Sequence, residues 1–585
     1  MKRLAVIKKD KCNPEGCGHF LCMRYCPINR KGDECIFKAD DHKAGILEEL
    51  CIGCMICVNK CPFGAIDVIN LPAEFDTEPI HRYGENKFVL FSLPTPVPGK
   101  VVGIIGKNGI GKSTAINILA GVEKPNLGKD KEAGFDDLLN YFKGTQAQRF
   151  FEKVRDGKIK VAYKPQHVDM IPKTAKGSVR LLLEKVNETG KLQEIVEALS
   201  LNKVLETNIN NVSGGELQRI AIAATVLKKA NLYIFDEPTS YLDIKQRLKV
   251  AQLIRSLVED GETSVLVIEH DLISLDYMTD LVHIMYGKSG SFGVVSLPKS
   301  TKEGINAYLA GYLKDQNIRF RDSKIVFDIK AALDTKTRMV LTSWPELDKK
   351  MGKFSLKTEA GELHKQLVVG VLGENGIGKT SFVKLLAGVE KPDHGNIDTE
   401  VAVSYKPQYL DNDSDELVQS ILGDAIEKYK TELIDPLEIE PLLLKQINQL
   451  SGGELQRVAI AAAMSRKAHL ILLDEPSAYL DVEQRLAVSK MIRYFVEAKG
   501  ISVLVVDHDL LFLDYASDKL LVFDGEPAVA GKVAGPFAME RGMNDLLTNL
   551  GISLRRDELS HRPRINKIGS YKDREQKKTG KLYYA

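Results

Sequence analysis

The chain carries the same series of five short motifs, in the same order, in each of its two halves. The paired motifs are Gly106–Ser113 and Gly373–Thr380, Tyr163–Gln166 and Tyr405–Gln408, Ser213–Arg219 and Ser451–Arg457, Asp236–Pro238 and Asp474–Pro476, and Glu269–Asp271 and Asp507–Asp509. Chance does not produce five matches in one order, so the chain contains two copies of one domain. At 585 residues it is also too long for a single hydrophobic core, and three or four domains are expected.

The first copy is longer than the second in the stretch that leads to the Ser-Gly-Gly motif. The first glycines of the two halves lie 267 positions apart, whereas the Ser-Gly-Gly motifs lie 238 apart. Most of the extra length falls at about Lys129–Lys158, where Asp136–Phe142, Gly144 and Ala147–Val154 predict a helix, a turn and a second helix. The insertion is either an inert surface hairpin or, because only one half carries it, a docking element.

Each half has a glycine-rich loop typical of proteins that bind nucleoside triphosphates. The loops follow apolar stretches at 101–105 and 368–372, which predict strands, and each leads into a predicted helix. Glycines let backbone N–H groups turn toward phosphates, and the helix adds the positive end of its dipole. We expect Lys112 and Lys379 to reach the β- and γ-phosphates. The predicted ATP-binding residues of the loops are Gly106, Asn108, Gly109, Gly111, Lys112, Ser113, Thr114, Gly373, Asn375, Gly376, Gly378, Lys379, Thr380 and Ser381.

The remaining repeated motifs supply acids and bases at matching places in the two halves. Asp236 and Asp474 end apolar stretches at 232–235 and 470–473, and we expect them to bind magnesium together with the hydroxyls of Ser113 and Thr380. The next residues, Glu237 and Glu475, are suited to polarise the attacking water. Gln166 and Gln408 are expected to contact both metal and water, and His270 and His508 to hydrogen-bond the γ-phosphate. A single histidine is often only structural, but two at one place in a repeat favour a catalytic role.

All nine cysteines lie between Cys12 and Cys61, a density typical of metal or cluster ligation. The second run has the spacing of bacterial ferredoxins, in which the fourth cysteine binds the other cluster. Two [4Fe–4S] clusters are therefore predicted, one held by Cys51, Cys54, Cys57 and Cys26 and the other by Cys12, Cys17, Cys22 and Cys61. Cys35 is left over as a buried or spare thiol. Structural zinc and electron transfer are the alternatives for these cysteines, and a rigid structural or coupling element is the favoured interpretation because nothing downstream resembles a redox site.

The composition indicates no particular function, but it argues against a membrane-spanning or secreted protein. The net charge is only +2, and the content of 44% hydrophobic and 27% charged residues is that of a globular protein. No apolar run reaches the roughly 20 residues of a membrane-spanning helix, and the first ten residues lack the apolar core of a secretion signal. We therefore expect a cytoplasmic protein with no membrane partner.

Each half ends in a basic segment. Asn317–Asp322 follows the first copy and Gly551–Asp557 follows the second. The last 31 residues, Arg555–Ala585, hold ten Lys or Arg against four Asp or Glu. So polar a stretch buries little surface of its own. It is expected to lie along the two repeated domains as a brace or hinge, with a loose RNA-binding tail as the alternative.

The Ser213–Arg219 and Ser451–Arg457 motifs resemble the signature motif of the ATP-binding-cassette superfamily. The resemblance implies an α/β fold with two head-to-tail P-loop nucleotide-binding domains, preceded here by a ferredoxin-like α+β iron–sulfur domain. In that family the signature contacts nucleotide held by the opposite cassette, so Ser451 and Gly453 are expected to complete the first site and Ser213 and Gly215 the second. Tyr241–Asp243 and Tyr479–Asp481 match the D-loops that cross this interface. Tyr83 and Phe88 are candidates to stack on adenine, and Phe354 is a weaker candidate in the second half.

The combination of cysteine runs, tandem cassettes, insertion and basic hinges resembles subfamily E, the ribosome-recycling ATPases historically called RNase L inhibitor. Cys61–Ile66 and His561–Asn566 extend this resemblance to both ends of the chain, although four residues rather than three separate Cys17 from Cys22. The resemblance implies ATP-driven splitting of post-termination or stalled ribosomes with a release factor or Pelota-type partner. Later association with the small subunit, and with initiation factors, is also implied.

The same resemblance implies contacts with ribosomal RNA by the insertion and by two hinges, at about Tyr312–Lys324 and Leu554–Lys567. The arginines expected to meet phosphates are Arg319, Arg321, Arg555 and Arg556. The predicted domains are an iron–sulfur domain at 1–75, a first nucleotide-binding domain at 76–305, hinge 1 at 306–335, a second nucleotide-binding domain at 336–545, and a basic hinge and tail at 546–585.

Three rival functions are weaker. A transporter ATPase subunit leaves the cysteines and paired hinges unexplained. A DNA-repair or chromosome ATPase of the superfamily needs coiled-coil or zinc insertions that the sequence lacks. A cluster-assembly or redox protein needs transferable clusters.

Overall fold

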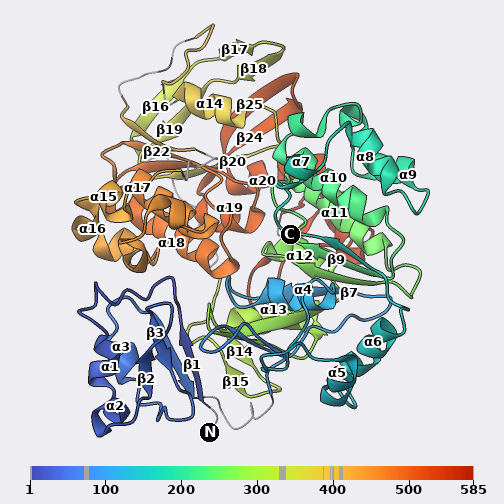
Figure 1. Cartoon of the computed structure of the whole chain (residues 1–585). Helices are drawn as coiled ribbons and strands as arrows, with labels where there is room; N and C mark the ends of the chain where they lie inside the picture. Colours follow the sequence, from blue (N-terminus) through green and yellow to red (C-terminus); the bar gives the residue numbers. More distant parts are fainter. Residues whose placement is uncertain are drawn as a thin grey trace.

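A computed structural model of the chain describes residues 3–70, 78–327, 338–386, 388–395, 397, 401–407 and 413–583. The predicted boundary at 75, the end of hinge 1 at 335 and the candidate Gln408 lie outside the described residues. Three bodies are visible in Figure 1: a small N-terminal domain, a first cassette and a second cassette. In the described part of the chain no helix is both long and apolar enough to cross a membrane.

The N-terminal domain is built from two small antiparallel sheets and three short helices. Its strands pair as β1 (Arg3–Ile7) with β4 (Ile66–Asn70) and β2 (Ile36–Lys38) with β3 (Ala44–Ile46). The helices are α1 (Leu21–Tyr25), α2 (Pro27–Lys31) and α3 (Ile56–Lys60). Its core consists of six of the nine cysteines together with aliphatic side chains of these strands, so the thiols replace much of an ordinary apolar core.

The first cassette has a mixed sheet whose central strands are parallel. Its strand order is β5 (His81–Arg82), β6 (Val89–Phe91), β12 (Phe292–Val295), β11 (Leu281–Lys288), β7 (Val101–Ile105), β10 (Ser264–Ile268), β9 (Leu232–Asp236) and β8 (Val161–Lys164), with β13 (Lys299–Ser300) paired to β11. The central strands are buried along their whole length, as their unbroken apolar sequences require. The helices are α4 (Lys112–Leu119), α5 (Phe135–Tyr141), α6 (Gln146–Arg155), α7 (Ile171–Thr174), α8 (Val179–Lys185), α9 (Leu192–Ala198), α10 (Gly214–Val226), α11 (Ile244–Ser256), α12 (Leu272–Met278) and α13 (Thr301–Ala310).

The second cassette repeats the eight-strand path of this sheet. Its order is β17 (Leu347–Met351), β18 (Phe354–Thr358), β25 (Ala530–Ala538), β24 (Lys519–Glu526), β20 (Val368–Leu372), β23 (Ser502–Val506), β22 (Leu470–Asp474) and β21 (Val403–Lys406), beside a separate pair of β16 (Val340–Trp344) and β19 (Gly361–His364). The helices are α14 (Lys379–Leu386), α15 (Val418–Leu422), α16 (Ala425–Lys428), α17 (Gly452–Ser465), α18 (Val482–Lys499), α19 (Leu510–Ala516) and α20 (Met539–Leu550). The fold class predicted from the repeat is therefore confirmed.

The insertion forms the predicted helix–turn–helix, α5 and α6, which lie at the edge of the first cassette far from the N-terminal domain (Figure 1). Phe142, Phe150 and Phe151 anchor it: all three are buried in the core of the cassette, and the rings of Phe142 and Phe151 stack at 5.2 Å. Lys143, in the turn, and Arg149, on α6, are exposed to solvent. The hairpin is thus a fixed platform that presents basic side chains.

Both basic segments fold as extended hairpins. The first pairs β14 (Tyr312–Leu313) with β15 (Ile318–Arg319), and the second pairs β26 (Leu554–Arg556) with β27 (Pro563–Ile565) before the terminal helix α21 (Tyr571–Thr579). We call residues 312–324 hinge 1 and 554–567 hinge 2. Arg321, expected to meet RNA phosphates, is instead buried against Glu483 at 2.7 Å. Because its guanidinium is committed to a neighbouring carboxylate, it does not present its charge to RNA in this conformation.

Hinge 2 follows the second cassette in the chain and binds to helices of the first cassette. Arg562 is fully buried and pairs with Asp276 of α12 at 3.2 Å, and Arg564 reaches the same carboxylate at 2.6 Å. Asp557 accepts a hydrogen bond from Asn306 of α13 at 3.1 Å. These contacts confirm the brace and exclude a wholly loose tail for residues 554–566.

We expect Asp276→Ala to release hinge 2 from the first cassette. Removing one partner of a buried ion pair costs about 3–5 kcal/mol, because the remaining charge stays uncompensated. Hydrogen exchange of the backbone amides at 554–566 should therefore accelerate by about 100-fold or more. The exposed Asp545 on α20 offers a matched control. Unchanged exchange in Asp276→Ala would show that apolar packing, not this carboxylate, holds the hinge.

Candidate nucleotide and iron–sulfur sites

The two glycine-rich loops have the same geometry. Each connects a buried central strand to a helix that begins at the loop lysine, Lys112 or Lys379. Lys112 Nζ donates to the carbonyl oxygens of Gly106 at 2.9 Å and Lys107 at 2.8 Å, and Lys379 Nζ makes the matching bonds at 2.8 Å. Burial lowers the pKa of both lysines, that of Lys379 to about 8. An anion such as a phosphate would offset this penalty, which is the property expected of a P-loop lysine.

The candidate catalytic and magnesium-binding residues of the first half lie together at the carboxyl end of β9. Gln166 Nε2 donates to Glu237 Oε1 at 2.8 Å, and Ser240 Oγ donates to Glu237 Oε2 at 3.1 Å. His270 Nε2 lies 3.6 Å from Glu237 Oε1. Burial, with the nearby charge of Lys112, holds the pKa of His270 well below its usual range, so the ring is neutral. Burial also raises the pKa of Asp236 to about 7, and a bound cation would return this carboxyl to its charged form.

The second half has the same arrangement of acidic residue, glutamate and histidine, with added contacts from Thr380 and Lys379. Thr380 Oγ1 donates to Asp474 Oδ2 at 3.0 Å, which places a predicted pair of magnesium ligands side by side. His508 Nε2 lies 3.8 Å from Glu475 Oε1 and 3.3 Å from Lys379 Nζ. Glu237 and Glu475 both adopt a φ of +46°, an uncommon conformation for a residue with a side chain. The same strained turn in both halves holds each glutamate at the end of its strand.

The two cassettes meet head to tail. The backbone N–H of Asn108, in the first loop, donates to Asp481 Oδ2 of the second cassette at 3.1 Å. The N–H of Asn375 donates in the same way to Asp243 Oδ2 of the first cassette at 3.1 Å. The hydroxyls of Tyr241 and Tyr479 lie 3.1 Å apart between these contacts. Each D-loop therefore binds the P-loop of the opposite cassette.

A single large cavity brings together the residues expected to form the first composite site. Lys112, Ser113, Glu237 and His270 of the first cassette line it, and so do Ser451 and Gly453 of the second. Ser451 and Ser213 each cap their own helix, accepting from the N–H three residues on, Glu454 at 3.4 Å and Glu216 at 3.3 Å. The N-terminus of the second signature helix, α17, thus faces the first P-loop across this cavity, while Ser213 and Gly215 do not line it.

The aromatic candidates for stacking on adenine lie beside the glycine-rich loops, and Phe354 occupies the same place in the second half as Phe88 in the first. Tyr83 and Phe88 line the cavity of the first site, and Tyr83 OH donates to Glu123 at 2.8 Å. The ring of Phe88 lies 2.5 Å from where a Cβ on Gly111 would stand, and the ring of Phe354 lies 2.9 Å from the matching point on Gly378. Phe354 is therefore the structural counterpart of Phe88 rather than a general core residue.

We expect Tyr83→Ala to weaken ATP binding at the first site by about 5- to 150-fold. This range corresponds to about 1–3 kcal/mol for loss of one base–aromatic stacking contact. Titration with a fluorescent ATP analogue measures the effect, and Tyr83→Phe separates stacking from the hydroxyl contacts. If Tyr83→Phe loses as much affinity as Tyr83→Ala, the bonds to Glu123 matter and the ring face does not.

Two supporting residues per half were missed by the sequence analysis. Lys164 Nζ, wholly buried, donates to the carbonyl oxygen of Asp236 at 2.8 Å, and Lys406 does the same to Asp474 at 2.7 Å. Gln218 and Gln456 donate to the carbonyls of Glu237 at 2.7 Å and Glu475 at 2.6 Å. These bonds fix the strained turns. All four residues lie inside the repeated motifs, so their recurrence was the available signal.

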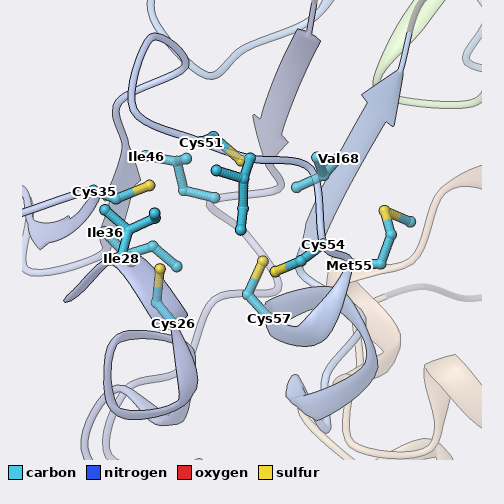
Figure 2. Close-up of a pocket in the computed structure, with 11 residues that line it drawn as sticks. Cys26, Ile28, Cys35, Ile36, Ile46, Cys51, Cys54, Met55, Cys57 and Val68 are labelled. Carbon is cyan, nitrogen blue, oxygen red and sulfur yellow. The ribbon is translucent and has the colours of Figure 1, made fainter. Parts of the chain in front are cut away.

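The predicted cysteine ligands lie close together in the N-terminal domain, in and beside one cavity. Cys26, Cys51, Cys54 and Cys57 line one small cavity (Figure 2). Isoleucines and Val68 complete its wall, which gives a dry surrounding suited to a polynuclear cluster. Burial raises the pKa of Cys22 to about 11, with further contributions from Cys12, Cys17 and Cys61, so the other four thiols lie together despite the longer spacing. Both sets of thiols fit the predicted clusters.

Cys35 also lines the cavity, beside the predicted ligands rather than away from them. Burial, together with the neighbouring Cys26 and Cys51, raises the pKa of its thiol to about 12. The ninth cysteine is thus a buried thiol in contact with the ligand set.

The N-terminal domain is fastened to the first cassette next to the first nucleotide site. Its buried Asp67 pairs with Lys8 at 2.9 Å and with Lys288 and Ser291 of the cassette. Asn86 of the cassette donates to the carbonyls of Ala5 and Ile46 at 3.1 and 2.9 Å. Lys8, Asp10 and Lys11, just before the first cysteine, line the same cavity as Lys112. Cluster and nucleotide sites are therefore structurally adjacent.

Comparison with known proteins agrees with this geometry. The family model of the ABC transporter ATPase domain matches residues 95–240 and 356–478. A 4Fe-4S binding domain matches 44–67, and a possible Fer4-like domain in RNase L inhibitor matches 3–34. The chain thus carries two ATP-hydrolysing cassettes and an iron–sulfur domain.

Full-length relatives give the family. The chain is 43% identical to translation initiation factor RLI1 of Saccharomyces cerevisiae over 100% of this chain and 98% of the relative. It matches archaeal ABCE1 in a model of ribosome-bound Pelota and ABCE1 with a TM-score of 0.95 and 51% identity, over 100% of this chain and 99% of that one. It matches a crystal structure of the archaeal stalk protein aP1 with the recycling factor aABCE1 with a TM-score of 0.82 and 52% identity, over 87% and 99%. The chain belongs to the RNase L inhibitor family, subfamily E of the ATP-binding-cassette proteins.

Proposed function

We propose that this protein is a ribosome-recycling ATPase, which splits post-termination or stalled ribosomes into subunits together with a release factor or Pelota-type partner. The observation that carries the proposal is the match, over the whole chain, to a relative described as ribosome-bound with Pelota. The relative named translation initiation factor RLI1 supports later association with the small subunit and initiation factors. The other structural relative is described as a recycling factor in complex with a ribosomal stalk protein.

Hydrolysis is assigned to the residues that the structure gathers at the interface. Glu237 and Glu475 orient and polarise the attacking water, supported by Gln166 and by neutral His270 and His508. Lys112 and Lys379 neutralise charge on the phosphates, and the opposite signature serines complete each site. Magnesium would be held by Ser113, Gln166 and Asp236 in the first half and by Thr380, Gln408 and Asp474 in the second, and would neutralise negative charge on the phosphates. The direct contact of Thr380 with Asp474 supports this assignment.

Each of the two sets of four cysteines is assigned to one [4Fe–4S] cluster, and the clusters serve as rigid cores of a small domain. Six cysteines stand among the buried side chains of its core, and of the predicted ligands only Cys22 and Cys57 lie within helices, so loops and helix ends hold the rest. A cluster-stiffened domain fastened beside a nucleotide site transmits motion as a solid body. Closure of the cassettes on ATP, driven by the tighter binding of ATP to the closed state, would thereby move this domain against the ribosome.

Contacts with ribosomal RNA are assigned to exposed basic side chains on fixed platforms. Lys143 and Arg149 on the insertion and Arg319 on hinge 1 are exposed, and Arg555 on hinge 2 is half-exposed. Arg321 is not among them because Glu483 holds it, and Arg556 donates to the carbonyl oxygen of His561 at 2.9 Å. Binding through such contacts weakens steeply with salt.

Sedimentation of ribosomes through sucrose gradients tests the proposal. Ribosomes are incubated with anaerobically purified protein, a release-type factor and ATP. We expect ATP-dependent conversion of whole ribosomes into free subunits, and no conversion with ADP or without the factor. Intact ribosomes in every lane, with both clusters present, would leave the ATPase without this substrate and overturn the proposal.

A further inference from the structure

The two nucleotide sites differ in one ion pair across the interface, in which the positive and negative residues have exchanged places. Each pair joins a P-loop residue to the second residue after the D-loop aspartate of the opposite cassette. In the first site the P-loop supplies Lys107 and the partner is Glu483, at 2.8 Å. In the second site the P-loop supplies Glu374 and the partner is Lys245, at 2.9 Å. The repeat is otherwise closely kept here, so this inversion is a specific difference between the sites.

The pair at the first site is continued into hinge 1. Glu483 accepts a second contact from Arg321 at 2.7 Å, and the hydroxyl of Tyr308 donates to it at 3.4 Å. The side chains of Lys107 and Glu483 are 45% and 18% exposed, and those of Lys245 and Glu374 are 48% and 36% exposed. Arg321, the second partner of Glu483, is only 9% exposed. A partly buried pair is screened less by solvent and salt than an exposed one. The contact between Glu483 and Arg321 is therefore the least screened of these ion pairs, and it has the first-site glutamate as its acceptor.

Glu483 also lies on an element that already touches the first P-loop. It is in the first turn of α18, which Asp481 caps, and Asp481 accepts the N–H of Asn108 at 3.1 Å. The start of α18 is thus joined to the P-loop by a backbone contact and a charge contact. Any movement of that P-loop relative to α18 changes both of them.

Charge inversion prevents the same continuation at the second site. The residue matching Glu483 is Lys245, which repels rather than attracts an arginine. Of the hinge-2 arginines, Arg562 and Arg564 bind Asp276 of α12 rather than the D-loop region, and Arg556 in β26 keeps its contacts within its own half. It donates to the carbonyl of His561 and lies 3.8 Å from Asp514, both in the second half of the chain.

We propose that Glu483 is a positioning residue that couples hinge 1 to nucleotide occupancy of the first site through the chain Lys107–Glu483–Arg321. This inference rests on the proposed assignment of Lys112 and Ser451 to one ATP site. When ATP binding and hydrolysis move the first P-loop against α18, Glu483 transmits the change to Arg321 and hence to the β14–β15 hairpin. The second site lacks this connection, so hinge 1 responds to the two sites unequally.

Hydrogen exchange of the full-length protein, with and without MgATP, tests the coupling. In the wild type we expect ATP to alter exchange both at α4 and at the hinge-1 amides 312–319. Glu483→Gln keeps the shape and removes the charge; it should lose the ATP-dependent change at hinge 1 while keeping that at α4. Lys245→Gln, the matched variant of the other half, should keep both.

A rescue experiment separates coupling from simple loss of structure. Lys107→Glu with Glu483→Lys restores the pair across the interface but sets the new lysine against Arg321, and we expect hinge 1 to stay uncoupled. Adding Arg321→Glu restores opposite charges along the chain and should restore the ATP-dependent change. A full response of hinge 1 in Glu483→Gln would overturn the inference. Absence of any ATP effect at α4 in the wild type would instead overturn the site assignment on which it rests.

Discussion

Replacing both glutamates, by Glu237→Gln with Glu475→Gln, is expected to lower the ATP hydrolysis rate by about 10²- to 10⁴-fold, the usual contribution of a general base. Glutamine is close in shape to glutamate and keeps one side-chain oxygen, which can still accept from Gln166, while the Ser240 hydroxyl can accept from the new amide N–H instead of donating. The attacking water, however, loses the carboxylate that polarises it. ATP binding should persist, and the protein should accumulate with ATP trapped between the cassettes. Steady-state phosphate release and retention of labelled ATP after gel filtration measure the two effects.

The matched control is Glu262→Gln, which removes a charge from an exposed turn of the first cassette. It should hydrolyse ATP at the wild-type rate. In the sucrose-gradient assay the double variant should bind ribosomes and fail to release them for further rounds. An unimpaired hydrolysis rate in the double variant would show that these glutamates do not activate the water, whatever their place at the interface.

The second large effect is expected from Cys54→Ser, which removes an exposed thiol of the cavity in Figure 2. Serine oxygen is a poor substitute for thiolate at iron, so one cluster should be lost and the iron content should fall from about eight to about four atoms per chain. Visible absorbance should fall in proportion. Because the P-loops lie in separate domains, ATP binding should remain within about twofold of wild type, while ribosome splitting should be abolished.

Cys35→Ser is the informative control, since Cys35 lies in the same cavity without belonging to the predicted ligands. It should retain the full iron content. If Cys35→Ser loses iron and Cys54→Ser does not, the assignment of ligands is wrong. If splitting survives in Cys54→Ser after loss of the cluster, the domain does not act as a cluster-stiffened body.

The elements that carry the chemistry follow from short stretches of sequence. Residues 101–105 and 368–372 are unbroken apolar runs followed by glycines, and they form β7 and β20 as expected. The insertion is a helix–turn–helix because Gly144 separates two segments with apolar residues on one face. The grouping of the cysteines follows from the ferredoxin spacing, and the composite site follows from the resemblance of the signature motif.

Contacts between distant segments were not predictable in the same way. The sequence shows that Arg321 is basic, but not that Glu483, far along the chain, lies 2.7 Å from it. It shows Phe354 as one aromatic among many, and only the packing against Gly378 reveals the counterpart of Phe88.

The sequence by itself thus determined the repeat, the two P-loop cassettes, the cysteine sets and the family, because each depends on local spacing that a backbone must satisfy wherever it lies. Only the tertiary structure decided which charges are free and which are committed. Asp276 receives two arginines of hinge 2, and Glu483 joins a P-loop to hinge 1. The sequence shows the sign of each charge, but which opposite charge lies beside it depends on how the domains pack.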